Sequence, residues 1–235
     1  MTPNQITTLR VAMAFVAVAL FGPNAWANLA AVALIVGAIA LDGVDGYLAR
    51  RKNLATPLGA QLDILGDRVI ENLFFTFFAV TGLVSLWVPV VFFVRGTLTD
   101  FIRSLAARSG RVGFGKNGML ETWWGRALVA SRSSRAAYAA LKCVCFCWLG
   151  LELTWMRGGA AALGLPAGYG VTLLRLGAQV LVGATLAFCL VRALPVVWEG
   201  RRYVNALAGV APRAAATSAR IRVSPPREAR VASIH

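Results

Sequence analysis

The stretch LDGVDGYLARRKNLATPLGAQLDILGD, from Leu41 to Asp67, lies between two strongly apolar runs. ANLAAVALIVGAIA precedes it, and NLFFTFFAVTGLVSLWVPVVFFV follows a few residues later. Its four aspartates are Asp42, Asp45, Asp63 and Asp67. A carboxylate beside hydrocarbon costs about 3 kcal/mol, so such acids usually face an interior cavity and serve a function. The stretch therefore predicts a helical membrane protein with an acidic functional site.

The composition supports this interpretation. Of 235 residues, 58% are hydrophobic and only 14% are charged, whereas soluble domains have roughly 25% charged residues. Apolar stretches of about 20 residues, the length that crosses a bilayer as a helix, recur along the chain. The predicted spans are 9–22, 25–49, 60–85, 87–107, 133–155 and 169–198. We therefore predict an all-α integral membrane protein, a bundle of six transmembrane helices.

The distribution of basic residues orients this bundle. The net charge is +14. The excess basic residues follow the second and sixth predicted spans and occur along the connection between the fourth and fifth spans. The intervening loops carry no charge except Arg157, in the loop 156–168. The positive-inside rule then places both termini in the cytoplasm, with the protein in the inner membrane. Topology and attraction to anionic lipid heads explain most of these arginines, so no nucleic-acid partner is expected.

The two ends of the chain differ in character. Residues 1–199 form the predicted membrane domain, and residues 200–235 form a basic cytoplasmic tail that we expect to be poorly ordered. An alternative for the N-terminus is a cleavable signal peptide, because an apolar run after Arg10 leads to Ala25-Trp26-Ala27. Hydrophobicity continues directly after that site, so we expect this segment to stay attached.

Histidine and cysteine usage excludes several kinds of site. The only histidine is His235, which rules out a Ser-His-Asp triad and a histidine-rich metal site. Cys143, Cys145 and Cys147 follow one another at spacing two, which places neighbours about 200° apart on a helix. These three cannot face one metal ion, and with Cys189 we expect them to be unpaired membrane cysteines.

Helical spacing gathers the acids on two faces. One face carries Asp42, Asp45, Gly46, Ala49 and Arg50, at i, i+3, i+4, i+7 and i+8. Asp63 and Asp67, at i and i+4, share a second face that Glu71 extends by another turn. Pro57 and Gly59 allow the chain to reverse between the two helices. Four carboxylates are thus expected to converge at the cytoplasmic end of the bundle.

Converging carboxylates need cations to stay ionised. Oxygen ligands select hard divalent ions, Mg²⁺ or Mn²⁺. Two such ions about 4 Å apart form the clamp that phosphoryl-transfer enzymes use. Salt bridges to Arg50, Arg51 and Arg68 are an alternative, but they do not require two facing acidic stripes. A cation-transport path through the membrane is a second alternative, but it would not explain why the acids are confined to the cytoplasmic end of the bundle.

The spacing of these residues resembles a family signature. Asp42-x-x-Asp45-Gly46-x-x-Ala49-Arg50, eight residues, then Gly59-x-x-x-Asp63-x-x-x-Asp67 fills every fixed position of the CDP-alcohol phosphatidyltransferase pattern. The N-terminal PNQITTLR is also similar to a pattern of this family, carried by Pro3, Asn4, Thr7 and Arg10. The resemblance covers roughly residues 2–200 and is specific through about residue 72.

The resemblance implies roles for individual residues. The four aspartates would hold two divalent cations, Mg²⁺ or Mn²⁺, at the pyrophosphate of CDP-diacylglycerol. Asp67 would also be the general base that takes the proton of the acceptor hydroxyl. Contacts to the CDP group would come from Asn4, Thr7, Gly46, Arg50 and Thr56. The hydroxyl would attack the phosphorus bound to diacylglycerol, and CMP would leave. Family members are often dimers, so a homodimer is compatible.

The sequence says less about which alcohol is the acceptor. LDILGDR departs here from the LDPLADK of members that make phosphatidylglycerophosphate. FIRSLAARSG and SRSSRAAY resemble basic positions with which other members bind the phosphate of an acceptor, and the candidates are Arg103, Arg132 and Arg135. These arginines could serve only to orient the protein in the membrane. If they instead bind a phosphate, the acceptor is a polyol phosphate. Glycerol 3-phosphate is our first choice and inositol phosphate the second. The alternatives outside enzymes are a cation transporter and a membrane scaffold.

Overall fold

The computed structural model describes residues 3–51, 57–109, 118–162, 164–166 and 170–207. Within these ranges it does not describe the side chains of residues 3, 42–51, 57, 58 and 60. Every regular element in the described part of the chain is a helix, which confirms the predicted all-α class. The long helices are α1 (Pro3–Leu20), α2 (Ala25–Arg51), α3 (Pro57–Val80), α4 (Trp87–Arg108), α6 (Arg132–Thr154) and α8 (Val171–Leu207).

These helices follow the predicted spans closely, and the differences lie at the ends. α1 begins at Pro3 rather than at residue 9, because proline at the first helical position is already fixed near a helical φ. The PNQITTLR segment is therefore helical and belongs to the bundle. α8 continues to Leu207, beyond the predicted domain boundary at residue 199, and that boundary stays a prediction.

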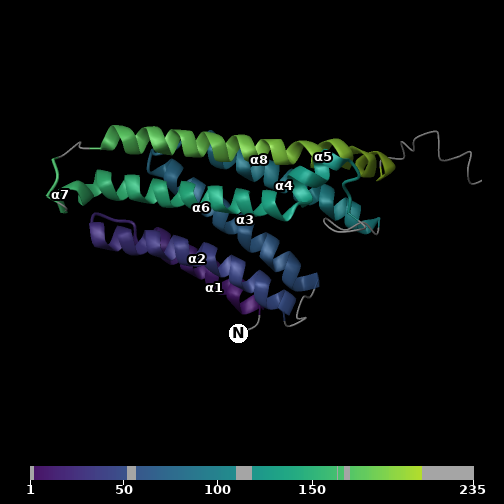
Figure 1. The fold of residues 1–235 in the computed structure, drawn as a ribbon, viewed down its shortest axis with the longest axis horizontal. Coiled ribbons are helices and arrows are strands. Elements are labelled where there is room, and N and C mark those ends of the chain that lie inside the picture. Colours follow the sequence, from purple (N-terminus) through teal and green to yellow (C-terminus); the bar gives the residue numbers. More distant parts are fainter. Residues whose placement is uncertain (1–2, 52–56, 110–117, 163, 167–169, 208–235) are drawn as a thin grey trace, which may run out of the picture.

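The helices form one elongated bundle (Figure 1). α1 packs against α2 and α3, α2 packs against α6, and α4 and α6 both pack against α8. Short elements complete the chain: α5 (Trp123–Gly125), the π-helical turn η1 (Arg126–Ala130), a second π-helical turn η2 (Trp155–Gly159) and α7 (Ala160–Ala162). α7 and the α1–α2 turn lie at one end of the bundle, and the start of α3 lies towards the other (Figure 1).

Phenylalanines fill the middle of the bundle. Phe75 of α3 stacks on Phe92 of α4 at 4.3 Å between ring centroids, and it meets Phe146 of α6 edge-on at 4.8 Å. Phe74 and Phe78 are also fully buried. Each buried ring contributes about 1.5–3 kcal/mol relative to an exposed one. This aromatic core fixes α3 against α4 and α6.

A polar clasp joins the end of α8 to the segment before α6. The Glu199 carboxylate accepts hydrogen bonds from the backbone N–H of Glu121, at 2.6 Å, and from the Thr122 hydroxyl. Arg202 forms an ion pair with Glu121 at 2.8 Å. Because Thr122 caps the short α5 helix, the clasp sets where the chain turns towards α6.

Among the described residues, two helical stretches are long and apolar enough to cross a membrane, Arg132–Ala162 and Val171–Asn205. α1 and α2 contain the shorter apolar stretches Asn4–Leu20 and Ala25–Leu41. α3 and α4 are interrupted by charged residues, which lowers their hydropathy. The number of spans and the side on which the termini lie remain predictions.

Candidate active site

The predicted acidic face of α3 lies against α1. Asp63 and Asp67 are about half exposed, each with 45% of its side chain accessible. Arg10 of α1, whose side chain is only 4% accessible, bridges them, with Nη1 at 3.0 Å from Asp63 Oδ1 and Nη2 at 2.8 Å from Asp67 Oδ1. The structure therefore brings these two acids together on one accessible surface, as the spacing predicted.

Arg10 also connects this pair to α2. Its Nε donates to the carbonyl oxygen of Ala38 at 3.2 Å. Ala38 continues a buried stripe of α2 that includes Ala31 and Ile35, and spacings of three and four place Asp42 and Asp45 at the next positions of that stripe. The structure describes the helix at these two aspartates but not their side chains.

The predicted donor-binding residues are only partly described. Thr7 is 7% exposed on α1, and a Cβ added to Gly66 would meet its methyl carbon at 2.9 Å. α1 and α3 thus approach closely between Asp63 and Asp67, so Thr7 lies beside the acidic pair. Asn4 is half-buried in the first turn of α1. The structure does not describe the surroundings of Gly46 or the side chain of Arg50, and Thr56 lies outside the described residues.

The chemistry of this surface suits a hard divalent cation. Asp63 and Asp67 offer accessible carboxylate oxygens from one helix face, the ligand type that Mg²⁺ and Mn²⁺ prefer. Among described residues, no three or more His, Cys, Asp or Glu side chains gather into a metal-binding group. The two further acids that a two-metal site needs are Asp42 and Asp45, so the metals stay a prediction.

One turn beyond Asp67, the same stripe of α3 enters a buried group of charges, which we call the central ion cluster: Arg68, Glu71, Arg95, Asp100, Arg103, Lys142 and Arg192. Glu71 is 2% exposed. It forms ion pairs with Arg68 at 3.0 Å and Lys142 at 3.5 Å, and it accepts a hydrogen bond from the Tyr138 hydroxyl at 3.0 Å. Glu71 thereby joins α3 to α6.

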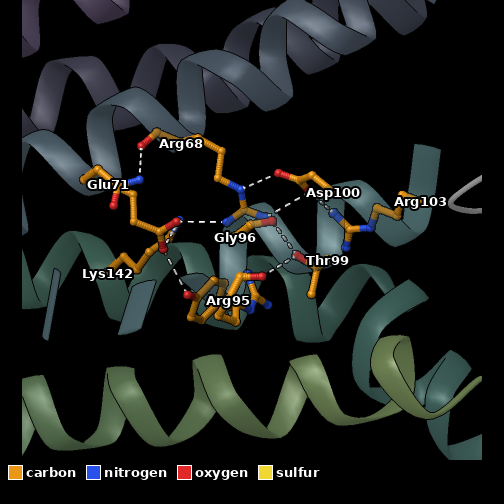
Figure 2. Close-up of polar contacts among 10 residues, drawn as sticks. Arg68, Glu71, Arg95, Gly96, Thr99, Asp100, Arg103 and Lys142 are labelled. Carbon is orange, nitrogen blue, oxygen red and sulfur yellow. Dashed lines mark hydrogen bonds and ion pairs between the residues drawn. The ribbon is translucent and has the colours of Figure 1, made fainter. Parts of the chain in front are cut away.

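Asp100 of α4 joins the other half of the cluster (Figure 2). It accepts from Arg68 Nε at 2.9 Å and from Arg103 Nη1 at 3.1 Å. Arg68 reaches it by passing over Gly96, where an added Cβ would lie 3.3 Å from the Arg68 Cδ and Nε atoms. Arg103, one of the predicted acceptor residues, is thus a member of the cluster.

Two buried arginines in the cluster lack full pairing. Arg95 of α4 is 9% exposed, and Arg192 of α8 is 6% exposed. Arg192 donates to the carbonyl oxygens of Leu128 and Val129, at 2.7 and 3.3 Å. The Nε atoms of Arg95 and Arg192 are buried without a hydrogen-bond partner in the described part of the protein.

The cluster therefore has an excess of positive charge. Its basic members are Arg68, Arg95, Arg103, Lys142 and Arg192, and its acidic members are Glu71 and Asp100. A buried charge is costly unless it is paired, so this arrangement is suited to an anion. Among the described residues, no acidic side chain forms an ion pair with Arg95.

The other two predicted acceptor residues lie at the surface beside the cluster, in a helical turn whose Ser134 hydroxyl accepts a hydrogen bond from Arg192. Arg132 and Arg135 are exposed in the first turn of α6, which Ser131 caps by accepting from the Ser134 N–H at 3.2 Å. Sequence reasoning missed Arg95, Lys142 and Arg192. A signal was present for two of them, because VVFFVRGTLTD and AFCLVRALPVV each place a lone arginine inside an apolar helix, which by itself marks a functional candidate.

Comparisons with known proteins identify the family of this chain. The model of the CDP-alcohol phosphatidyltransferase family matches residues 1–174. A CDP-diacylglycerol–glycerol-3-phosphate 3-phosphatidyltransferase of Pseudomonas fluorescens is 35% identical over 136 residues, which cover 54% of this chain and 66% of that protein, just under two thirds. The Bacillus subtilis protein of the same name is 29% identical over 135 residues, 52% of this chain and 70% of that one.

A relative that matches over a shorter stretch has a different activity in its name. A CMP-forming cardiolipin synthase of rice is 37% identical over 71 residues, which cover 29% of this chain and 21% of that protein. With the family match extending over most of its length, the chain belongs to the CDP-alcohol phosphatidyltransferase family.

Proposed function

We propose that the protein transfers a phosphatidyl group from CDP-diacylglycerol to the hydroxyl of a small phosphorylated alcohol and releases CMP. Glycerol 3-phosphate is the first-choice acceptor, in keeping with the names of the Pseudomonas and Bacillus relatives. The observation that carries the proposal is the buried excess of positive charge one turn beyond Asp67. Cation transport and a purely structural role are disfavoured, because neither requires an anion site beside the acids.

The distance between the two charged regions fits a short acceptor. Asp67 and Glu71 are four residues apart on α3, a rise of about 6 Å along the helix. A polyol phosphate with its phosphate near Arg95 and Arg192 would present its hydroxyl towards Asp67. Arginine suits this role because its guanidinium stays charged and binds phosphate with two hydrogen bonds. Free serine, which has no phosphate, would leave these charges uncompensated.

The reaction then divides among the residues of the two regions. Asp42, Asp45, Asp63 and Asp67 would hold two Mg²⁺ or Mn²⁺ ions, which when bound neutralise the donor pyrophosphate and acidify the acceptor hydroxyl. Asp67 takes the hydroxyl proton as general base. The alkoxide oxygen forms a bond to the phosphorus that carries diacylglycerol, the bond from that phosphorus to CMP breaks, and CMP leaves with the electron pair.

Other residues bind and orient the substrates. Arg10 holds Asp63 and Asp67 at a fixed separation, and Asn4, Thr7, Gly46, Arg50 and Thr56 remain the proposed contacts to CDP. Arg103 would close the acceptor site from α4. Arg132 and Arg135, at the surface, would attract the phosphate before it enters.

We also propose the membrane arrangement in full. All six long helices would cross the inner membrane, with both termini, residues 200–235 and the active site on the cytoplasmic side. The basic segments after α2, α4 and α8 support this orientation through the positive-inside rule. A homodimer in the membrane is compatible with this arrangement.

The test is an acceptor screen with the purified full-length protein. CDP-diacylglycerol is supplied with Mg²⁺ or Mn²⁺, and CMP release is measured with glycerol 3-phosphate, inositol phosphate, phosphatidylglycerol or serine. We expect release with glycerol 3-phosphate, a phosphorylated lipid product by mass spectrometry, and loss of both with EDTA. Turnover with inositol phosphate alone would show that inositol phosphate, not glycerol 3-phosphate, is the acceptor. Turnover only with serine would refute the proposed phosphate site.

A further inference from the structure

A second candidate site lies at the end of the bundle away from the acidic pair, around α7 (Figure 1). Here the first turn of α2, the end of α6 with η2, and the start of α8 enclose an apolar cavity of about 410 Å³, which we call the distal pocket. Its walls include Ala25 and Leu29 of α2, Trp155 of η2 and Leu174 of α8. Ligand sites typically measure roughly 300–1,000 Å³, so the pocket is large enough for a ligand.

An unusual backbone shapes this pocket. α6 does not stop at a regular cap but runs into the π-helical turn Trp155–Gly159. Within it Gly158 has φ +101°, a conformation that glycine adopts without steric cost. The kink turns the chain away before α7. π-helical turns occur frequently at functional sites, and this one forms part of the wall.

A second hollow is lined by residues that neighbour those of the distal pocket along the chain, and it carries a positive charge. It has a volume of about 420 Å³ and is lined by Gly22, Pro23 and Arg157. Arg157 lies in η2 between Trp155 and Gly159, which line the distal pocket. Its side chain is exposed, and among the described residues it forms no ion pair. It is also the only charged residue of the loop 156–168.

We propose that these two cavities together bind one anionic phospholipid of the surrounding membrane. One acyl chain lies in the distal pocket, whose lining is apolar, and the phosphate lies at Arg157. A fully polar ligand would leave its groups unpaired against the apolar wall, and an uncharged lipid would make no use of the arginine. The site is separate from Asp63 and Asp67, so this inference goes beyond phosphatidyl transfer and does not depend on it.

The test measures lipid retention by native mass spectrometry. The full-length protein in detergent is equilibrated with equal amounts of phosphatidylglycerol and phosphatidylcholine that have identical acyl chains. We expect one retained phosphatidylglycerol, preferred about two- to fivefold, the size of a single exposed charge contact. Arg157→Gln should abolish the preference and leave some lipid bound. Equal retention of both lipids by the unmodified protein would overturn the role of Arg157.

A pair of variants tests the pocket itself. Ala25→Phe places a ring into the distal pocket and should release the retained lipid. Ala30→Phe is the matched control, because Ala30 is exposed on the same helix and does not line the pocket. Loss of lipid in Ala25→Phe but not in Ala30→Phe supports the site. Equal retention in both variants would place the lipid elsewhere and refute the proposal, whether or not phosphatidyl transfer is observed.

Discussion

The acidic pair Asp63/Asp67 and the central ion cluster lie one turn apart on α3, yet their charge balances are opposite. The acidic pair has two half-exposed carboxylates, and the guanidinium of Arg10 bridges them. The cluster has the fully buried Glu71, and its basic side chains outnumber its acids. The first region therefore has room for added cations, and the second is suited to an added anion.

This difference matches the charges of the two proposed substrates. A donor pyrophosphate can approach carboxylates only with cations between them, whereas an acceptor phosphate can contact arginines directly. One helix supplies both environments, and Asp67 lies at their boundary. Changes on either side of that boundary should therefore affect different kinetic constants, which makes the comparison testable.

The largest effect is expected at the boundary itself. Asp67→Asn should lower kcat by about 10²- to 10⁴-fold, the usual contribution of a general base. The amide oxygen can still accept a hydrogen bond from Arg10, so thermal unfolding should change little. The measurement is CMP release at saturating substrates, together with a melting curve. Turnover within a few-fold of the unmodified enzyme would remove Asp67 from this role.

The second prediction isolates the donor side. Asp42→Ala and Asp45→Ala should each abolish metal-dependent binding of CDP-diacylglycerol as well as turnover, because each removes a proposed metal ligand. Asp67→Asn, by contrast, should retain part of that binding. A titration of the donor with and without Mg²⁺ compares the three variants. Normal metal-dependent donor binding by either alanine variant would contradict the two-metal arrangement.

The third prediction isolates the acceptor side. Arg95→Gln should lower kcat/KM for glycerol 3-phosphate roughly 10- to 100-fold, because a charge-assisted contact contributes about 1.5–3 kcal/mol. The KM for CDP-diacylglycerol should change little. Arg108→Gln, at an exposed position of the same helix, is the control. Equal effects on both substrates would show that Arg95 acts on the fold and not on the acceptor.

A fourth prediction concerns the packing beneath the acidic pair. Gly66→Ala should push Thr7 away from α3 and destabilise the fold by about 1–3 kcal/mol, since the added Cβ would lie 2.9 Å from the threonine methyl. Donor binding should weaken as Arg10 shifts with α1. Gly183→Ala is the control, because a Cβ there meets nothing within 4 Å. Similar melting temperatures for both variants would mean that α1 adjusts freely.

Much of the fold could be predicted because apolar runs of helical length are local signals. The alignment of Asp63 with Asp67 is also local, since it depends only on helix geometry. The convergence of Arg95, Lys142 and Arg192 is not local, because three separate helices supply them. Spacing within a helix shows which residues share a face but not which face packs inward. For that reason Glu71 was recognised as part of the stripe while its partners Lys142 and Tyr138 were not.

The smallest effect is expected from Arg132, and it sharpens the comparison between buried and exposed charges. The i, i+3 spacing of Arg132 and Arg135 suggested direct phosphate contacts, but both side chains are exposed at the start of α6. An exposed charge contributes about 0.2–1 kcal/mol, which is at most roughly a fivefold change.

Arg132→Ala should therefore raise the KM for glycerol 3-phosphate less than fivefold, and the difference should shrink at high salt, because exposed charges are screened beyond about 10 Å at 0.1 M. The loss in Arg95→Gln should persist under the same conditions, since buried charges are screened much less. Steady-state kinetics at low and high ionic strength compare the two variants. A steep, salt-independent loss in Arg132→Ala would mean that the phosphate binds at the start of α6, and the buried cluster would then need another ligand.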